Sequence, residues 1–118
     1  MNASDISISI SIVIYELDEA TLENCLDSLK TALKSCDPSL GTINWQVKLI
    51  DNGDNEHSLT SFHSENLSIV KNLKNIGYGA AHNQAIMAAH SDFHLILNPD
   101  VILDPDYLRF TIKFMIRN

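Results

Sequence analysis

The 118 residues are enough for one small domain, so we expect residues 1–118 to form a single domain. A hydrophobic content of 45% lies in the globular range and excludes wholesale disorder. Fifteen acidic residues against eight Lys and Arg give a formal net charge of -7, which excludes the basic face that nucleic-acid binding requires. If the protein binds a phosphate compound, something other than lysines must neutralise it.

Targeting and membrane signals are absent from the pattern of the sequence. The segment Met1–Asp5 has no basic stretch, and no apolar run approaches the roughly 20 residues of a membrane helix. Cys25 and Cys36 lack a CxxC spacing, so we expect reduced thiols. Together these features predict a cytoplasmic protein.

The first half of the chain predicts two strands separated by a helix. Isoleucines alternate with serine from residue 6 and then run continuously apolar to residue 15, which is typical of a strand that becomes covered on both faces. An acidic start at Asp18 and a stripe of leucines predict a helix that closes near residues 36–38. A second strand is expected over 45–50, and a polar loop over 53–66.

The second half continues the same alternation. We expect a short strand over 67–70, a glycine turn over 75–79 and a helix of small residues over 80–89. A fourth strand follows over 93–97. The last helix is expected to have Pro105 at its first helical position.

Strands that alternate with helices predict an α/β fold, a Rossmann-like and mainly parallel sheet with helices on both faces. Ligands of such sheets bind beyond the carboxyl ends of the strands. Four polar or glycine-rich clusters follow the four expected strands, at Tyr15-Glu16, Asp51-Asn52, residues 75–79 and residues 98–100. We therefore expect one ligand site at this edge of the sheet.

Asp100 is the candidate metal ligand of this edge. Mg²⁺ and Mn²⁺ prefer oxygen ligands and often take only one or two carboxylates, with water and substrate phosphates completing the shell. A cation here would meet a diphosphate in a chain that is short of lysines. The alternative is that Asp100 or Asn98 only caps the turn before Val101.

The other edge residues also allow two interpretations each. Asp51 either accepts a hydrogen bond from the imide N–H of a pyrimidine base or belongs, with Asn52 and Gly53, to a plain turn. The Tyr15 ring either stacks on a base or closes the core. Asn83 lies one helical turn beyond the glycines, where it can face the same cleft.

Several other site types are not favoured by the sequence. The segment 77–82 lacks the third glycine of a dinucleotide fingerprint and follows the third strand instead of the first. His57 and His63 match no zinc spacing, so we expect a solvated loop there. The remaining histidines, His82, His90 and His94, are expected to be structural, and no Ser-His-Asp or Cys-His nucleophile set can be assembled.

Five short segments together resemble the N-terminal, nucleotide-binding half of family 2 (GT-A fold) glycosyltransferases, in particular the rhamnosyltransferase-like branch that builds bacterial surface polysaccharide. The segments are Ser11–Tyr15, Cys25–Leu29, Leu49–Asn52, Asn75–Asn83 and Leu95–Val101. They occur in the order of the family and span nearly the whole chain.

The resemblance implies roles for specific residues. Tyr15 and Asp51 hold the base, and Asn98-Pro99-Asp100 corresponds to the Asp-x-Asp motif, with Asp100 as the principal ligand of Mg²⁺ or Mn²⁺. Glu16 stands where the family usually has asparagine, which adds a negative charge near the nucleotide. The expected donor-binding residues are Tyr15, Glu16, Asp51, Asn52, Asn75, Gly77, Gly79, Asn83 and Asn98.

The implied activity is sugar transfer, with dTDP-rhamnose as the expected donor among dTDP- and UDP-sugars and a lipid-linked saccharide of O-antigen synthesis as acceptor. Such an enzyme works in the cytoplasm, peripheral to the inner face of the plasma membrane. Family members continue well past residue 118, where the general base is expected, so the chain is expected to be an inactive N-terminal fragment with an exposed sheet edge prone to self-association. The alternatives are a non-catalytic nucleotide-binding fragment and a flavodoxin-like or dinucleotide-binding regulatory domain.

Overall fold

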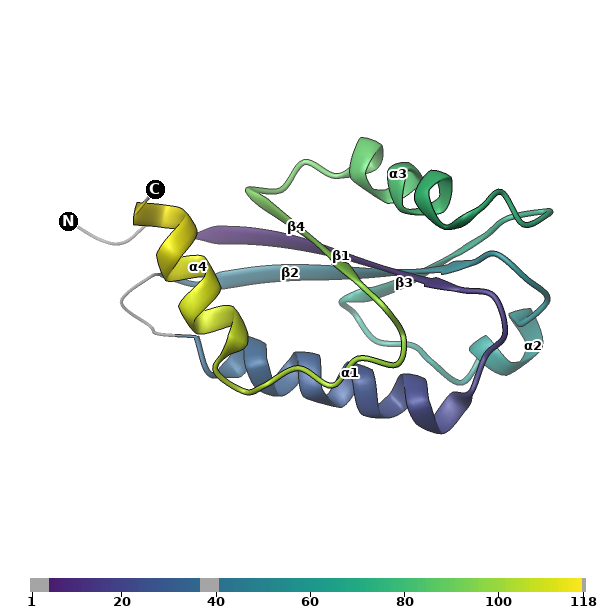
Figure 1. Ribbon diagram of the computed structural model, residues 1–118, viewed down its shortest axis with the longest axis horizontal. Helices are drawn as coiled ribbons and strands as arrows, with labels where there is room; N and C mark the ends of the chain where they lie inside the picture. Colours follow the sequence, from purple (N-terminus) through teal and green to yellow (C-terminus); the bar gives the residue numbers. More distant parts are fainter. Residues whose placement is uncertain (1–4, 37–40, 118) are drawn as a thin grey trace.

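The computed structural model describes residues 5–36 and 41–117. In these residues four parallel strands form one sheet in the order β3-β2-β1-β4 (Figure 1). The strands are β1 (Ile6–Ile14), β2 (Ile43–Asp51), β3 (Leu67–Lys71) and β4 (Phe93–Leu97). The parallel sheet confirms the predicted α/β, Rossmann-like class.

Helices cover both faces of this sheet, as predicted. The long helix α1 (Glu19–Lys34) and the last helix α4 (Tyr107–Arg117) lie on one face, and α3 (Tyr78–Ala88) lies on the other (Figure 1). A single short turn of helix, α2 (Glu56–Leu59), follows β2. No helix of the described residues is long and apolar enough to span a membrane.

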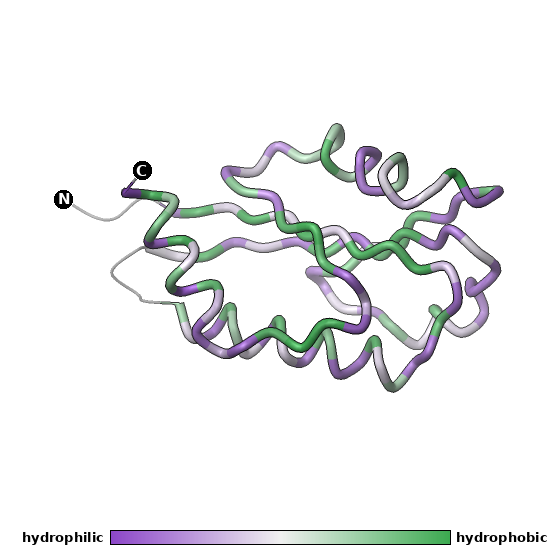
Figure 2. The backbone as a smooth tube through the Cα atoms, in the orientation of Figure 1, coloured by the Kyte–Doolittle hydropathy of each residue, from purple (hydrophilic) through white to green (hydrophobic). Residues whose placement is uncertain are grey.

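The larger core lies between the sheet and α1 with α4. It uses the alternation of β1: the even-numbered isoleucines from Ile6 to Ile14 are all buried and pack against leucines of α1 and against Leu108 and Ile112 of α4. Burying one such side chain contributes about 1.5–3 kcal/mol. Figure 2 shows hydrophobic residues recurring along these central strands.

The α3 side of the sheet is different, because serines occupy it along much of β1. A small core joins Val13 and Ile50 to Ala81 and Ala85 of α3. Ser7 and Ser9 lie farther toward the start of β1, where both are half-buried. The continuous apolar end of β1 is therefore covered on both faces, as its pattern predicted.

The strand order places the ligand crevice. The order 3-2-1-4 is that of a Rossmann fold, whereas a flavodoxin-like sheet runs 2-1-3-4, so the flavodoxin-like alternative does not fit. The order reverses between β1 and β4, and ligands bind at such a switch point outside the carboxyl ends of the strands. The glycine turn follows β3, whereas a dinucleotide fingerprint follows the first strand of its unit.

Two predicted elements differ in detail. The segment 53–66 contains α2, because the fully buried Leu59 anchors one helical turn in an otherwise polar stretch. The prediction that Pro105 stands at the first position of the last helix is wrong, because this helix begins at Tyr107. The Asp104 carboxylate instead accepts from the Asp106 N–H at 2.8 Å, which closes a turn before the helix.

The start of α1 agrees with the prediction, because the Asp18 side chain accepts from the Thr21 N–H at 3.1 Å and so caps the helix. The helix ends at Lys34 with Ser35 as its C-cap. The predicted stop at residues 36–38 lies mostly outside the described residues. Both cysteines are free thiols, and Cys25 is buried.

Candidate functional site

The carboxyl ends of the strands bring the four predicted clusters to one edge of the sheet. Ile14, Asp51 and Lys71 are cross-strand neighbours, so β1, β2 and β3 end at the same level. β4 ends at Leu97, which pairs with Ile12. The residues that follow each strand therefore emerge side by side, as the sequence predicted.

Asp51 lies at the centre of this edge and is fully buried. One oxygen accepts from the Gly53 N–H and from Nδ2 of Asn55, both at 3.0 Å. The other accepts from the Asn55 N–H at 3.1 Å and from Nζ of Lys71 at 3.2 Å. Each carboxylate oxygen thus already accepts two hydrogen bonds from the protein.

These contacts decide the charge state of Asp51. Burial alone would raise the pKa of this carboxyl, but the hydrogen bonds from Asn55, Gly53 and Lys71 outweigh burial and hold the pKa below its ordinary value. A base that binds Asp51 must displace one of these donors. The partly exposed Lys71 ammonium makes the longest of the four contacts.

Gly53 sets the approach of the turn to the end of β1. A Cβ at this position would collide with the carbonyl oxygen of Tyr15, so the turn needs glycine here. The same carbonyl accepts from Nδ2 of Asn55 at 2.8 Å. The Tyr15 side chain is 58% exposed, so its ring does not close the core and remains open to a ligand.

A network of amide side chains ties the end of β2 to the glycine turn. Nδ2 of Asn52 donates to Oδ1 of Asn75 at 2.8 Å and to the Gly77 carbonyl at 3.2 Å. Oδ1 of Asn52 accepts from Nδ2 of Asn72 and from the Ile76 N–H. Asn52 is buried, so its first task is to hold the turn in place.

The turn itself requires glycine at one position. Gly77 has φ of 89°, which L side chains rarely adopt, and α3 begins at the next residue. Gly79 faces open space: apart from its chain neighbours and the backbone of its own helix, no atom lies within 4 Å of where its Cβ would be. Asn83 is exposed farther along α3.

The loop after β4 joins the site through Tyr78. The Tyr78 hydroxyl donates to Oδ1 of Asn98 at 2.6 Å, which links the start of α3 to this loop. From the other side, Sγ of Cys25 donates to the Asn98 carbonyl at 3.5 Å, and the Leu103 N–H donates to Oγ of Ser28 at 3.0 Å. Helix α1 therefore supports the loop that carries Asp100.

Asp100 is exposed, and its carboxylate makes no hydrogen bond or ion pair with the other described residues. Its charge is felt by Cys25: burial first, and then the Asp100 carboxylate, raise the pKa of this thiol to about 11. The thiol is thus neutral at physiological pH and acts only as a support for the loop.

The oxygen ligands that this loop offers can supply part of the coordination shell of Mg²⁺ or Mn²⁺. Asp100 offers a free carboxylate, and Oδ1 of Asn98 has a second lone pair besides the one that accepts from Tyr78. Among the described residues, no three His, Cys, Asp or Glu side chains gather closely enough to hold a metal by themselves. The loop therefore fits a cation that takes one carboxylate from the protein and its other oxygens from water and phosphate.

An open cleft of about 470 Å³ lies at this edge and contains several predicted residues. Tyr15, Glu16, Asn52 and Asn75 line it, whereas Asp51 is buried beside it. The predicted residues Gly77, Gly79, Asn83, Asn98 and Asp100 are not part of its lining. The complete lining is Tyr15, Glu16, Asn52, Gly53, Asp54, Asn55, Lys74 and Asn75.

Sequence reasoning did not single out several residues of this edge, including Gly53 and Asp54 of the cleft lining. Asn55 and Lys71 engage Asp51, Tyr78 reaches Asn98, and Lys74 brings a positive charge to the cleft. Tyr78 had a signal, because it lies between the two glycines of the expected donor segment. Asn55 and Lys74 lie in polar stretches without a periodic signal, and Lys71 is the last residue of β3.

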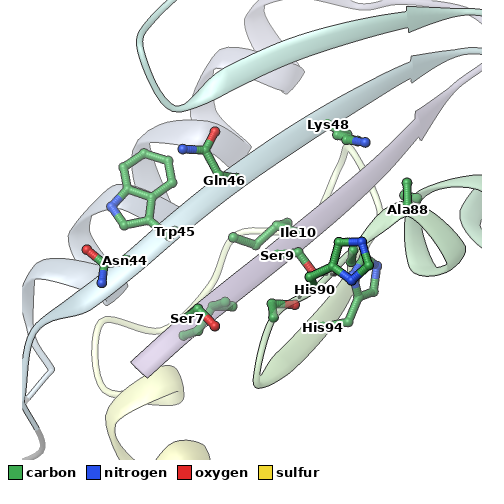
Figure 3. Close-up of a pocket in the computed structure, with 14 residues that line it drawn as sticks. Ser7, Ser9, Ile10, Asn44, Trp45, Gln46, Lys48, Ala88, His90 and His94 are labelled. Atoms are coloured by element: carbon green, nitrogen blue, oxygen red, sulfur yellow. Dashed lines mark hydrogen bonds between the residues drawn. The ribbon is translucent and has the colours of Figure 1, made fainter. Parts of the chain in front are cut away.

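A second cavity, of about 300 Å³, lies near the opposite end of β1 on the α3 side. Ser7, Ser9 and His94 contribute to its lining from β1 and β4 (Figure 3). None of the residues predicted to bind donor or metal lies in this cavity.

Comparisons with known proteins agree with this architecture. Residues 9–118 match the family described as glycosyl transferase family 2. No curated protein gave a significant match. Among solved structures, S. aureus TarS 1–349 aligns at 18% identity with a TM-score of 0.69, over 95% of this chain and 33% of that one.

Two further structures show the same fold. S. aureus TarS aligns at 18% identity and TM-score 0.70, over 95% of this chain and 20% of that one. The mannosyltransferase PcManGT from Pyrobaculum calidifontis, in complex with GDP-Man and Mn²⁺, aligns at 18% identity and TM-score 0.67, over 92% of this chain and 32% of that one. The chain spans a third or less of the length of these structures.

The family match covers nearly all of the chain, and the structural likeness places its sheet and helices in a fold seen in a glycosyltransferase. By the family match, the chain belongs to glycosyl transferase family 2.

Proposed function

We propose that this chain binds the nucleotide-sugar donor of a glycosyl transfer at the carboxyl edge of its sheet. The observation that carries this proposal is the convergence of an exposed tyrosine ring, a glycine turn and a free carboxylate on one hydrogen-bonded edge of a family 2 chain. The cleft at this edge, lined by Tyr15 and Asn75, is open enough to admit a nucleotide.

The nucleotide is held by groups of different chemistry. The exposed Tyr15 ring offers its face to a base. Asp51 meets the imide N–H only where Lys71 gives up its contact, as the crowded carboxylate requires. The start of α3 after Gly77, together with the open space at Gly79, leaves room for the anionic diphosphate at a helix N-terminus.

Asp100 and Asn98 would hold Mg²⁺ or Mn²⁺ beside this diphosphate. When bound, the cation stabilises the charge of the leaving diphosphate. The chain needs such help because its net charge is -7, and Glu16 and Asp54 offset Lys74 in the cleft. The mannosyltransferase with the same fold binds its GDP-Man together with Mn²⁺, which supports a nucleotide sugar and a divalent cation here.

For the whole protein we propose rhamnosyl transfer from dTDP-rhamnose to a lipid-linked saccharide at the inner face of the plasma membrane. These finer assignments depend on the rhamnosyltransferase-like motifs in the sequence, among them Asn98-Pro99-Asp100. We assign no general base to this chain. We therefore expect it to bind donor without transferring sugar, which an assay with dTDP-rhamnose and lipid-linked acceptors would check.

Titration calorimetry with dTDP and UDP tests donor binding. We expect binding in Mg²⁺ or Mn²⁺ and much weaker binding in EDTA. Asp100→Asn removes the charge of the metal ligand and should abolish the difference between the two conditions. The matched control is Asp27→Asn, which removes an exposed charge from α1 and should leave both affinities unchanged.

Equal affinity of the wild-type chain in EDTA and in Mn²⁺ would remove the metal from the proposal. Absence of binding to dTDP and UDP in either condition would contradict the donor site itself.

A further inference from the structure

A continuous chain of polar side chains crosses the interface between α3, β1 and β4. Oγ of Ser11 lies 2.7 Å from Nδ1 of His82 and 2.8 Å from Nε2 of His94. Nδ1 of His94 lies 2.6 Å from Oγ of Ser9, which lies 2.7 Å from Oγ of Ser91. Figure 3 shows the far end of this series of side chains, at Ser9 and His94.

One arrangement of the protons serves every contact shorter than 3 Å in this series of side chains, and it starts at the far end. The Ser91 hydroxyl donates to the Phe93 carbonyl at 2.9 Å, and a carbonyl can only accept. With the Ser91 proton on that carbonyl, Ser9 donates to Ser91 at 2.7 Å and not to the same Phe93 carbonyl, which lies 3.5 Å from Oγ of Ser9. Ser9 in turn accepts from Nδ1–H of His94.

The protons follow the same direction at the near end, which is His82. Burial lowers the pKa of His94, so the ring is neutral and its Nε2 is a bare acceptor. Ser11 donates to that nitrogen and therefore accepts from Nδ1–H of His82. Burial first, and then the neighbouring His94, lower the pKa of His82 as well, which leaves Nε2 of His82 as an acceptor.

Nε2 of His82 has no hydrogen-bond partner among the described residues, although the side chain is only 2% exposed. An unpaired polar atom in a buried position costs free energy and calls for a reason. What the ring does contact is Tyr78: the two ring centroids lie 4.4 Å apart at an interplanar angle of 76°. Tyr78 is the residue whose hydroxyl donates to Asn98.

We propose that His82 is a positioning residue of the donor site: held by Ser11 in its neutral Nδ1–H form, it fixes the Tyr78 ring so that the Tyr78 hydroxyl orients the Asn98 side chain for the cation and the diphosphate. This inference rests on the proposed function. It assigns to His82 and Tyr78, which the donor-binding residues named above do not include, a shared task in that site.

The Tyr78 hydroxyl acts on the metal site through the lone pairs of the Asn98 side chain. Oδ1 of Asn98 has two lone pairs, and the Tyr78 hydroxyl occupies one of them at 2.6 Å. The other lone pair is then held in a fixed direction, on the loop that carries Asp100. Without the hydroxyl, the exposed Asn98 side chain is free to rotate, and its amide can turn N–H groups toward the cation.

Two variants test whether His82 and Tyr78 orient the Asn98 side chain. Tyr78→Phe removes only the hydroxyl from an exposed side chain and is expected to fold like the wild type. His82→Phe keeps a ring beneath Tyr78 but breaks the contact with Ser11. The matched control is Tyr107→Phe, which removes an exposed hydroxyl from α4.

The first measurement is the affinity for dTDP and UDP, by calorimetry in Mg²⁺ and in EDTA. One oriented hydrogen bond corresponds to a change of about two- to tenfold. We expect Tyr78→Phe and His82→Phe each to weaken binding about three- to tenfold in Mg²⁺ and less than twofold in EDTA. Tyr107→Phe should change neither value.

The second measurement is the ¹⁵N NMR spectrum of the histidine side chains, which identifies the protonated nitrogen of each ring. We expect both His82 and His94 to carry the proton on Nδ1 at neutral pH. A proton on Nε2 of His82, or wild-type affinity of Tyr78→Phe in Mg²⁺, would overturn the inference. If the wild-type chain binds neither nucleotide, the proposed function fails and the positioning role with it, whereas the NMR result separately decides the proton arrangement.

Discussion

At the scale of single residues, Gly53 shows how closely the site edge is packed. An added Cβ would meet the Tyr15 carbonyl, which belongs to the backbone and cannot rotate away. We expect Gly53→Ala to lower the free energy of unfolding by about 2–3 kcal/mol, as overpacking does in cores. Urea denaturation measures the change.

Gly79→Ala is the control for this prediction. Gly79 lies in α3 with open space around it, so the alanine should leave stability unchanged or raise it by up to about 1 kcal/mol. Equal effects of the two substitutions would contradict the close approach of Gly53 to Tyr15.

Asp51 gives the second prediction, which concerns its charge. Asp51→Asn puts an NH₂ group where the carboxylate now accepts from Asn55 and Lys71, so donors would face donors. We expect a loss of about 2–4 kcal/mol in the free energy of unfolding at pH 7. Urea denaturation of both chains between pH 2.5 and 7 measures it.

The pH dependence of that loss has a definite sign. The pKa of Asp51 is lower in the folded protein than its ordinary value of 3.8. The carboxylate therefore contributes its full stabilisation above the pKa of the unfolded chain and loses it as the pH falls through the folded pKa. The difference between wild type and Asp51→Asn should shrink with falling pH, and a constant difference would refute this account.

Among the secondary-structure elements, α1 is important because it packs in the core and also supports the loop of Asp100. Its N-cap is Asp18, whose carboxylate accepts from Thr21. We expect Asp18→Ala to lower the free energy of unfolding by about 0.5–2 kcal/mol, since it leaves a helix N–H unpaired. Thermal melts of Asp18→Ala and of the mid-helix control Asp27→Ala compare the two, and equal losses would speak against the cap.

Most elements could be predicted from the sequence because their patterns are long or strongly periodic. The alternation of β1 and the leucine stripe of α1 fix both the type of element and the buried face. The four residues of α2 are too few for a period, and only the burial of Leu59 reveals their role. Pro105 gave a wrong helix start because the backbone conformation that proline prefers also suits the turn that Asp104 closes.

The edge that holds the candidate site could also be predicted, because parallel strands end together. The sequence could not predict which polar side chains at this edge bind other protein groups and which remain open to a ligand. The sequence predicts that Asp51 and Asn52 face the ligand, yet both bind protein groups: Asp51 accepts from its neighbours Gly53 and Asn55 and from the distant Lys71, and Asn52 binds distant groups such as Asn75. The turn contacts of Asp51 have a local signal in Asp51-Asn52-Gly53, whereas the pairings with Lys71 and Asn75 depend on three-dimensional packing and leave none.

At the scale of the whole molecule, exposed apolar surface predicts self-association. Several large side chains of α4, among them Phe110, are about half or more exposed, and β3 and β4 form the two edges of the described sheet. Edges and apolar patches of this kind favour pairing with further copies. Light scattering should show oligomers that Phe110→Lys weakens, and a monomer at all concentrations would contradict the prediction.

NMR of the ¹⁵N-labelled chain with dTDP and Mg²⁺ decides whether a nucleotide binds at the carboxyl edge of the sheet. We predict that the amide signals of Tyr15, Gly53 and Asn75 shift on titration, and that Mn²⁺ in place of Mg²⁺ broadens the signals around Asp100. The signals of Ser7 and Trp45, in the cavity at the other end of β1, should stay in place. Shifts confined to that cavity, or no shifts at the carboxyl edge, would contradict the account.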